Sequence, residues 1–232
     1  MSLGQHINAL FAVFGLSVHR TSSDAKKLNE GFDQHVEMAA AAGVDVNDYM
    51  ETSLGWSPAK SFTSDYLLPH INSAAVVCEL GPGTGRNTRH LIHRVSSLHV
   101  VDHSAWFCNF LRDYFRDAPN LHIHLNDGSN LPLDDRSCDL AFANGIFTHR
   151  TLGLMHNYAK EFYRVLKPGG YCVINFYDPT SERGWRRFVS TGDECTYHSK
   201  FVVERVFSEA GFSTITFDQP DHRTIMTARK PI

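Results

Sequence analysis

The feature that most constrains the fold is a short apolar run that leads directly into three closely spaced glycines. Residues 74–78 are apolar, as in a strand buried on both faces of a sheet. Gly81, Gly83 and Gly85 follow, and the segment that begins at Asn87 has the apolar pair of a helix. In a strand, glycine turn and helix of this kind, backbone N–H groups face a ligand that approaches closely. The pattern therefore predicts a ligand-binding turn after the first strand of an α/β sheet.

The glycine spacing and two acidic residues narrow the class of ligand. The spacing G-x-G-x-G differs from the G-x-G-x-x-G of dinucleotide-binding turns, because the third glycine comes one residue early. Glu79 lies two residues before the first glycine, and Asp102 lies 21 residues after Gly81, at the end of a second apolar run. A carboxylate there can accept hydrogen bonds from both hydroxyls of a ribose. These residues indicate a ligand that contains adenosine.

The segment Glu79-Leu-Gly-Pro-Gly-Thr-Gly, together with Asp102, resembles the S-adenosylmethionine-binding motifs of the class I methyltransferases. Further segments resemble the same family and occur in the family's order: residues 126–128, 131–144, 146–149 and 164–170. The resemblance covers roughly residues 70–229. It implies an α/β three-layer sandwich around a seven-stranded, mostly parallel sheet whose last strand is antiparallel.

The resemblance also implies how the chain is organised. Residues 1–70 are expected to form an N-terminal helical segment that acts as a lid, and residues 71–232 the methyltransferase domain. Residues 178–198 form a long polar connection after the fifth strand, where members of this family carry insertions that determine substrate specificity. A chain of 232 residues is long enough for one such domain with these additions.

The cofactor that the resemblance implies is S-adenosyl-L-methionine. Asp102 and the adjacent His103 are expected beside the ribose, Asp127 and Gly128 beside the adenine, and Asn144 beside the methionyl part. A plain turn acid is the alternative interpretation of Asp127. The complete set of expected cofactor-binding residues is Glu79, Gly81, Gly83, Gly85, Asp102, His103, Asp127, Gly128 and Asn144.

Two histidines are candidates for the base that removes a proton from a hydroxyl or amine acceptor. His149 follows the fourth strand, and His198 immediately precedes the helix that Ser199 caps. Histidine suits this role because its pKa lies near neutral pH. A structural role is the alternative for His149. No metal is expected, because the fourth strand ends in Asn144 rather than in a cluster of carboxylates.

Composition excludes several classes of partner and compartment. The net charge of −3 lacks the basic excess that nucleic-acid binding usually requires, so no nucleic-acid substrate is expected. Five cysteines without a C-x-x-C pair indicate buried thiols in a reducing compartment, and the expected location is cytoplasmic.

Residues 7–18 have apolar side chains at helical spacing. They are interpreted as a helix packed on the domain or, alternatively, as an amphipathic segment that contacts a membrane or a partner.

The sequence therefore predicts an S-adenosylmethionine-dependent methyltransferase that acts on a small-molecule acceptor such as a sugar or a secondary metabolite. Oxygen is the favoured acceptor atom. Two alternatives stay open: a catalytically silent S-adenosylmethionine-binding regulatory protein, and an NAD-dependent oxidoreductase. The glycine spacing and the Leu166–Gly170 turn argue against the oxidoreductase.

Overall fold

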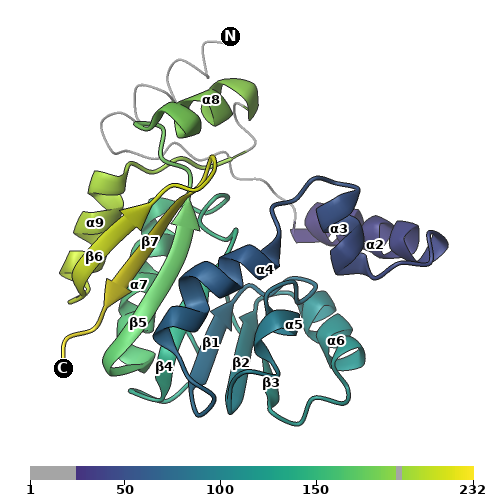
Figure 1. Ribbon diagram of the computed structural model, residues 1–232, viewed down its shortest axis with the longest axis horizontal. Helices are drawn as coiled ribbons and strands as arrows, with labels where there is room; N and C mark the ends of the chain where they lie inside the picture. Colours follow the sequence, from purple (N-terminus) through teal and green to yellow (C-terminus); the bar gives the residue numbers. More distant parts are fainter. Residues whose placement is uncertain (1–24, 192–194) are drawn as a thin grey trace.

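The computed structural model describes residues 25–191 and 195–232, and within them the strands form one seven-stranded sheet (Figure 1). The strand order is β3-β2-β1-β4-β5-β7-β6. The strands are β1 (Val76–Leu80), β2 (Ser97–Asp102), β3 (Leu121–Leu125), β4 (Cys138–Ala143), β5 (Leu166–Phe176), β6 (Ser213–Asp218) and β7 (Thr224–Arg229). Neighbouring strands from β3 to β5 are parallel, and β7 is antiparallel to both β5 and β6. The predicted sheet is therefore confirmed.

Helices cover both faces of this sheet, which confirms the expected three-layer arrangement (Figure 1). The helical segments are α2 (Ala25–Ala41), α3 (Val46–Thr52), α4 (Ala59–Phe62), η1 (Thr63–Leu67), η2 (Leu68–His70), α5 (Thr88–Leu91), α6 (Ala105–Tyr114), α7 (Leu152–Val165), α8 (Glu182–Thr191) and α9 (Lys200–Glu209). Side chains cap the starts of four of the described helices. The predicted cap Ser199 accepts a hydrogen bond from the first turn of α9, and Asp45, Ser104 and Thr151 do the same for α3, α6 and α7.

The strand side chains alternate between two apolar cores. In β1, Val77 packs in the core that includes residues of α4, α5 and α6, whereas Cys78 packs in the core that includes residues of α7 and α9. In β4, Phe142 and Ala143 divide in the same way. This period of two is the pattern expected of strands buried on both faces. The alternation therefore determines which face of the sheet each strand side chain occupies.

Two local expectations were wrong. The first strand is Val76–Leu80 rather than residues 74–78, because parallel neighbours on both sides continue its pairing as far as Leu80. The sequence also predicts that Ser64 or Asp65 opens the helix before this strand, because both residue types cap helices. The helix begins instead at Ala59, directly after Pro58, where a proline is well tolerated, and the Ser64 hydroxyl bonds Asp65 and the carbonyl oxygen of Ser61.

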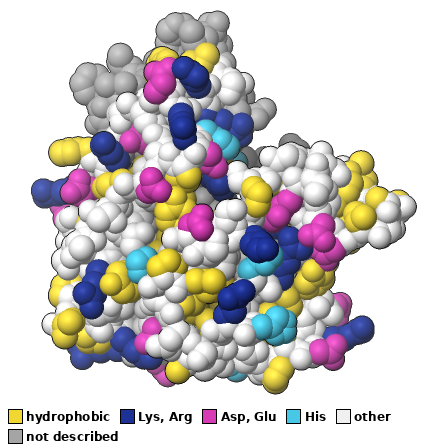
Figure 2. All heavy atoms as spheres, in the orientation of Figure 1, with side chains coloured by type: hydrophobic (Ala, Val, Ile, Leu, Met, Phe, Trp, Pro, Cys, Tyr) yellow, Lys and Arg dark blue, Asp and Glu magenta, His cyan; other side chains and the backbone are white. Residues whose placement is uncertain are grey.

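The surface in the view of Figure 2 mixes acidic and basic side chains, in keeping with the small net charge. Nothing in the described parts of the chain is a helix long and apolar enough to cross a lipid bilayer. The amphipathic segment at residues 7–18 lies outside the described residues.

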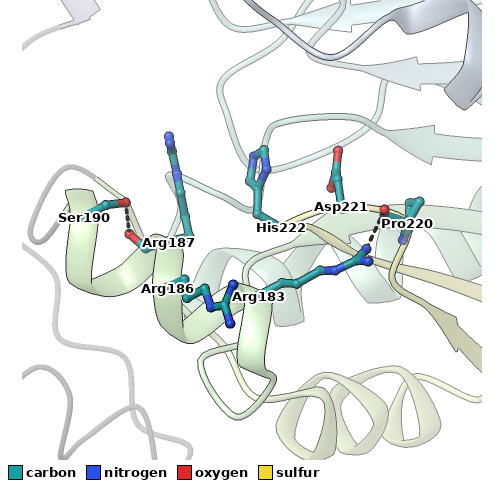
Figure 3. A pocket seen from close by; sticks show the side chains of 7 residues that line it. All are labelled: Arg183, Arg186, Arg187, Ser190, Pro220, Asp221 and His222. Atoms are coloured by element: carbon teal, nitrogen blue, oxygen red, sulfur yellow. Dashed lines mark hydrogen bonds between the residues drawn. The ribbon is translucent and has the colours of Figure 1, made fainter.

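The connection after β5 contains a helix of its own. Within residues 178–198, α8 lies beside the turn that joins β6 to β7 (Figure 3). Nη1 of Arg183 bridges the two segments by donating to the carbonyl oxygens of Gln219 (3.1 Å) and Pro220 (2.7 Å). The region expected to act as a specificity insertion therefore projects beyond the carboxyl end of β5.

Candidate cofactor and acceptor site

The three glycines after β1 have different structural roles. All have positive φ: +68° at Gly81, +56° at Gly83 and +83° at Gly85. A Cβ atom at Gly81 would lie 2.1 Å from the Ile146 side chain, and one at Gly85 would lie 2.5 Å from the ring of Phe115. At Gly83 such an atom would meet nothing within 4 Å. The outer glycines therefore allow tight packing, whereas the middle one borders the open space that a ligand of the loop would fill.

The helix that follows this loop is short, since α5 comprises only four residues. The loop backbone is therefore what can contact a ligand. Gly81 N–H donates to the carbonyl oxygen of Val101 at 2.8 Å, which joins the loop to the end of β2.

Glu79 lies beneath the glycine loop and is buried, with 1% of its surface exposed. Its Oε2 accepts a hydrogen bond from the hydroxyl of Thr88 at 2.6 Å. Burial raises the pKa of the Glu79 carboxyl to about 7, although the hydrogen bonds from Thr88 and Asn87 act in the opposite direction. A positive group bound above the loop would favour the ionised form of this carboxyl.

Asp102 ends β2 and is also buried, with 5% of its surface exposed. Its Oδ1 accepts a hydrogen bond from Ser104 N–H at 2.8 Å and lies 3.4 Å from His103 Nδ1. The carboxylate is thus held in one orientation by the start of α6. It can still accept hydrogen bonds from ligand hydroxyls through its other oxygen.

The residues expected beside the adenine lie next to Asp102 in space. Asn126 N–H donates to the Asp102 carbonyl oxygen at 2.9 Å, and a Cβ at Gly128 would lie 3.9 Å from Cβ of His103. Asp127 is exposed, and its Oδ1 accepts hydrogen bonds from the Ser129 hydroxyl and backbone, which lower the pKa of Asp127. The residues expected beside the ribose and the adenine therefore lie together at one edge of the sheet. Asp127 also accepts hydrogen bonds within its own turn.

Asn144 follows β4 and belongs to a network of amides that the sequence did not reveal. Its Nδ2 donates to Oδ1 of Asn87 at 3.2 Å, and its Oδ1 accepts from Nδ2 of the fully buried Asn175 at 2.5 Å. Asn175 Oδ1 in turn accepts from Gly145 N–H at 2.7 Å. The network joins the glycine loop, β4 and β5. A polar residue within the otherwise apolar strand around Asn175 was the signal that could have identified it.

The helix α3 contacts the glycine loop through a reciprocal pair of hydrogen bonds. Asn47 Nδ2 donates to the carbonyl oxygen of Thr84 at 3.1 Å, and the Thr84 hydroxyl donates to Asn47 Oδ1 at 2.7 Å. Both side chains are buried. Residues that precede the first strand are therefore fixed to the loop that the sequence assigns to the cofactor.

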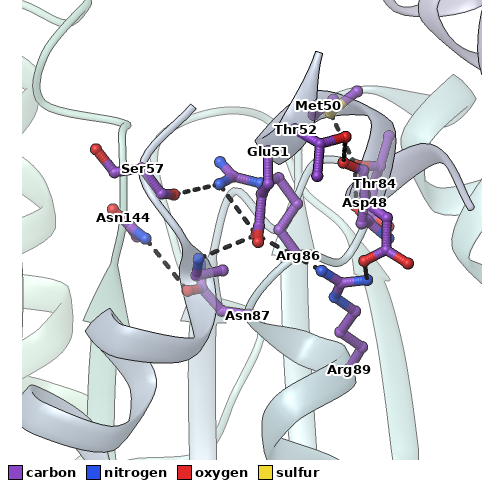
Figure 4. Close-up of polar contacts among 12 residues, drawn as sticks. Asp48, Met50, Glu51, Thr52, Ser57, Thr84, Arg86, Asn87, Arg89 and Asn144 are labelled. Carbon is purple, nitrogen blue, oxygen red and sulfur yellow. Dashed lines mark hydrogen bonds and ion pairs between the residues drawn. The ribbon is translucent and has the colours of Figure 1, made fainter. Parts of the chain in front are cut away.

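Two arginines that follow the loop strengthen this attachment (Figure 4). Arg86 Nη2 donates to the carbonyl oxygen of Ser57 at 2.5 Å and lies 3.3 Å from a Glu51 carboxylate oxygen. Arg89 Nη1 lies 2.7 Å from Asp48. Neither arginine was predicted from the sequence as part of the site. These contacts attach residues 45–57 to the glycine loop, and the role of this segment as a lid stays a prediction.

The two candidate bases come from segments that contact each other. Thr196 N–H donates to the carbonyl oxygen of Thr148, and His198 N–H donates to that of Tyr177. His149 is exposed, whereas only 3% of the His198 surface is. The structure thus brings both histidines to the carboxyl ends of β4 and β5.

His198 is held in a defined tautomer. Its Nε2 lies 3.0 Å from the carbonyl oxygen of Arg150, so Nε2 carries the proton and donates it. Burial lowers the pKa of His198 to about 4, which makes its imidazole neutral but weakly basic at pH 7. This environment favours a positioning role for His198. The assignment of either histidine as the base stays a prediction.

Two further observations bear on metal and acceptor binding. Within residues 25–191 and 195–232, no group of three or more His, Cys, Asp or Glu side chains is arranged to hold a metal ion.

Asp178 is buried just after the fifth strand, where its Oδ1 accepts hydrogen bonds from the backbone and hydroxyl of Thr180. Asp178 therefore stabilises the start of the segment that carries α8.

Known proteins share this combination of fold and loop. Residues 77–170 match a family model described as a methyltransferase domain. A malonyl-[acyl-carrier protein] O-methyltransferase from Marinomonas sp. is 37% identical over 111 residues, which cover 47% of this chain and 40% of that protein. Over residues 77–170 the chain is therefore similar to methyltransferase domains, and the expected cofactor, S-adenosyl-L-methionine, agrees with these findings.

Solved structures agree at the level of the fold. A complex of the Haloferax volcanii Trm112 methyltransferase activator with a methyltransferase gives a TM-score of 0.65 at 20% identity, over 87% of this chain and 98% of that one. Geranyl diphosphate C-methyltransferase from Streptomyces coelicolor, solved with S-adenosyl-L-homocysteine, gives 0.59 at 17% identity, over 73% and 76%. The chain spans about half or less of the length of the first curated relatives that it matches.

Proposed function

We propose that this protein is an S-adenosylmethionine-dependent methyltransferase that acts on a small-molecule acceptor, with oxygen as the favoured acceptor atom. The observation that carries the proposal is the open space at Gly83, in a loop that directly follows the strand of the buried Glu79 and is joined by Gly81 to the strand that ends in the buried Asp102. A positive-φ glycine with no protein atom above it allows a ligand to approach the backbone. Two buried carboxylates suit a cationic nucleoside.

When bound, S-adenosylmethionine supplies a methyl group that is already activated as part of a sulfonium. In this proposal the chain binds and orients it. Asp102 accepts hydrogen bonds from the ribose hydroxyls, and Gly83 allows close approach of the methionyl part beside Asn144. We infer that α3, which contacts the loop through Asn47, helps to exclude water, which would suit a reaction whose rate depends mainly on the alignment of the reacting atoms.

His149 is the favoured candidate for the base in this proposal. It is exposed at the carboxyl edge of the sheet, and a hydroxyl or amine acceptor must lose a proton during methyl transfer. The buried His198 is proposed to support the segment of residues 148–150 through its hydrogen bond to Arg150.

Two relatives support the proposed class of acceptor. The Marinomonas protein is named as an O-methyltransferase of a malonyl group on a carrier protein, and the Streptomyces protein as a C-methyltransferase of geranyl diphosphate. Both names describe transfer to a small organic group. The first supports oxygen as the acceptor atom, and we extend that preference to this chain.

Isothermal titration with S-adenosylhomocysteine and NAD tests the cofactor part of the proposal. The chain should bind S-adenosylhomocysteine and not NAD. Asp102→Ala should weaken S-adenosylhomocysteine binding about tenfold or more, because charged hydrogen bonds to the ribose are each worth about 1.5–3 kcal/mol. Asp135→Ala, a change at an exposed carboxylate outside the loop, is the control and should leave the affinity unchanged. Binding of NAD alone, or of neither compound to the folded chain, would refute the proposal.

A further inference from the structure

Asn175 is a fully buried polar residue between Ile174 and Phe176 of β5. The strands β4 and β5 are parallel, and Ala143 pairs with Ile174. Asn144 therefore lies beside Asn175 where the two strands end. A buried amide adds little net stability, because the loss of its hydration offsets most of what its hydrogen bonds contribute. What the amide supplies is direction, since its oxygen only accepts hydrogen bonds and its nitrogen only donates them.

A backbone N–H determines how a row of three amides is oriented. Gly145 N–H can only donate, so Oδ1 of Asn175 faces it, at 2.7 Å. Nδ2 of Asn175 then points to Oδ1 of Asn144, at 2.5 Å, and Nδ2 of Asn144 points to Oδ1 of Asn87, at 3.2 Å. Figure 4 shows this last contact, in which Asn144 and Asn87 turn toward each other. The orientation of the Asn144 amide is therefore determined from the side of β5.

The turn after β4 lies between Asn175 and the glycine loop. Gly145 has a φ of +84°, and its carbonyl oxygen accepts a hydrogen bond from the buried hydroxyl of Thr148 at 2.7 Å. The side chain of Ile146 packs so closely on Gly81 that a Cβ atom at Gly81 would lie 2.1 Å from it. Asn175 thus holds the start of a turn that also contacts the first glycine of the loop.

Asn144 keeps hydrogen-bonding capacity for a ligand. It is partly exposed, whereas Asn87 and Asn175 are buried. Among residues 25–191 and 195–232, the neighbouring amides use one N–H of its Nδ2 and one lone pair of its Oδ1, so a second N–H and a second lone pair can serve a ligand. The amino acid end of S-adenosylmethionine carries an ammonium, which donates, and a carboxylate, which accepts. An amide with a donor and an acceptor to offer suits both groups.

From this geometry we propose that Asn175 is a positioning residue, which acts through Asn144 to hold the amino acid end of the cofactor. The proposal rests on the proposed methyltransferase function and adds a residue that is itself fully buried. An amide that its neighbours already orient loses little side-chain entropy when it binds a ligand. The position of the amino acid end also sets the position of the sulfonium methyl group, which must align with the acceptor.

Calorimetry with two ligands tests the proposal. S-adenosylhomocysteine contains the amino acid end, whereas 5′-methylthioadenosine is a thioether of the same nucleoside without it. Asn175→Ala should weaken the binding of S-adenosylhomocysteine about tenfold, the loss expected for about one hydrogen bond. The affinity for 5′-methylthioadenosine, measured by competition with S-adenosylhomocysteine, should change by less than about twofold.

Val173→Ala is the matched control, because it removes buried volume from the same strand without removing a polar group. It should lower the thermal unfolding midpoint and leave both affinities unchanged. If Asn175→Ala loses its circular dichroism spectrum, Asn175→Val takes its place, since valine favours strands and also lacks the amide.

A double-mutant cycle shows whether Asn175 acts through Asn144. Asn144→Ala alone should weaken the binding of S-adenosylhomocysteine about tenfold, and the addition of Asn175→Ala should weaken it by less than about threefold more. Two independent losses would instead multiply to about a hundredfold.

Three results would overturn the inference: parental affinity in the folded Asn175 variants, equal weakening for the two ligands, or independent losses in the cycle. Any of them, with normal binding of S-adenosylhomocysteine by the parent chain, would leave the proposed function intact. Failure of the parent chain to bind S-adenosylhomocysteine would instead overturn that function.

Discussion

Replacement of Gly83 by valine separates the binding role of the glycine loop from its role in folding. A Cβ atom at this position meets no protein atom within 4 Å, so the variant should contain no internal clash. What remains is backbone strain, because φ is +56°. A non-glycine residue in the left-handed region costs about 1–2 kcal/mol, and valine lies at the upper end. Thermal unfolding should therefore shift down by about 4–8 °C, at about 2–4 °C per kcal/mol for a chain of this size.

The effect on the cofactor should be much larger. The valine side chain would occupy the space where the methionyl part approaches the loop, so S-adenosylhomocysteine affinity should fall at least about a hundredfold, or about 2.8 kcal/mol. Calorimetry measures the affinity, and circular dichroism melting measures the stability.

Gly43→Val is the matched control. Gly43 has φ of +68° and also has no atom within 4 Å of its Cβ position, but it lies after α2 and away from the loop. The control should show the same loss of stability with unchanged affinity. If Gly83→Val binds S-adenosylhomocysteine within about threefold of the parent chain, the loop does not hold the cofactor and the reasoning fails.

Three further predictions concern the lid and the histidines. Asn47→Ala should destabilise the chain by about 1–3 kcal/mol in urea unfolding, because the buried Thr84 groups lose their partners; a change below about 0.5 kcal/mol would contradict the attachment of α3. His198 has a pKa of about 4 in the folded chain against about 6.5 unfolded, so its contribution to stability is complete above pH 6.5 and is lost as the pH falls from 6.5 to 4, by about 3 kcal/mol. Glu79, with its pKa raised to about 7, changes the stability in the opposite direction over much of this range. The measurement is therefore the difference in the free energy of unfolding between the parent chain and His198→Gln, determined by urea unfolding at each pH. Parallel pH profiles of the two chains would refute the prediction for His198. His149→Ala should slow methyl transfer about a hundredfold in single-turnover assays while S-adenosylhomocysteine affinity stays unchanged, and parental rates would exclude a role as base.

The glycine loop and the buried strand that precedes it were accessible from the sequence because their causes are local. A positive-φ turn needs glycine at fixed spacing, and a buried strand needs a continuous apolar run. The caps at Ser104 and Ser199 were predictable for the same reason, since a side-chain oxygen bonds a backbone N–H only three residues away.

The partners of the site residues were not accessible. Asn175 bonds Asn144 across two strands, and Asn47 bonds Thr84 across 37 residues of chain. Such contacts depend on which elements become neighbours, and a single sequence contains no local pattern for them.

The sequence by itself indicated the class of the domain, the position of the glycine loop and the acidic residue that ends β2. These features depend on backbone conformation and on residue types within a few positions of each other. Only the tertiary structure decided that Glu79 is buried enough to raise its pKa to about 7 and that His198 is enclosed and weakly basic. It also decided that arginines of α8 face the turn before β7. Burial and the distances between charges result from the packing of segments that are far apart in the sequence. They determine the pKa values of ionisable groups, which the sequence alone does not show.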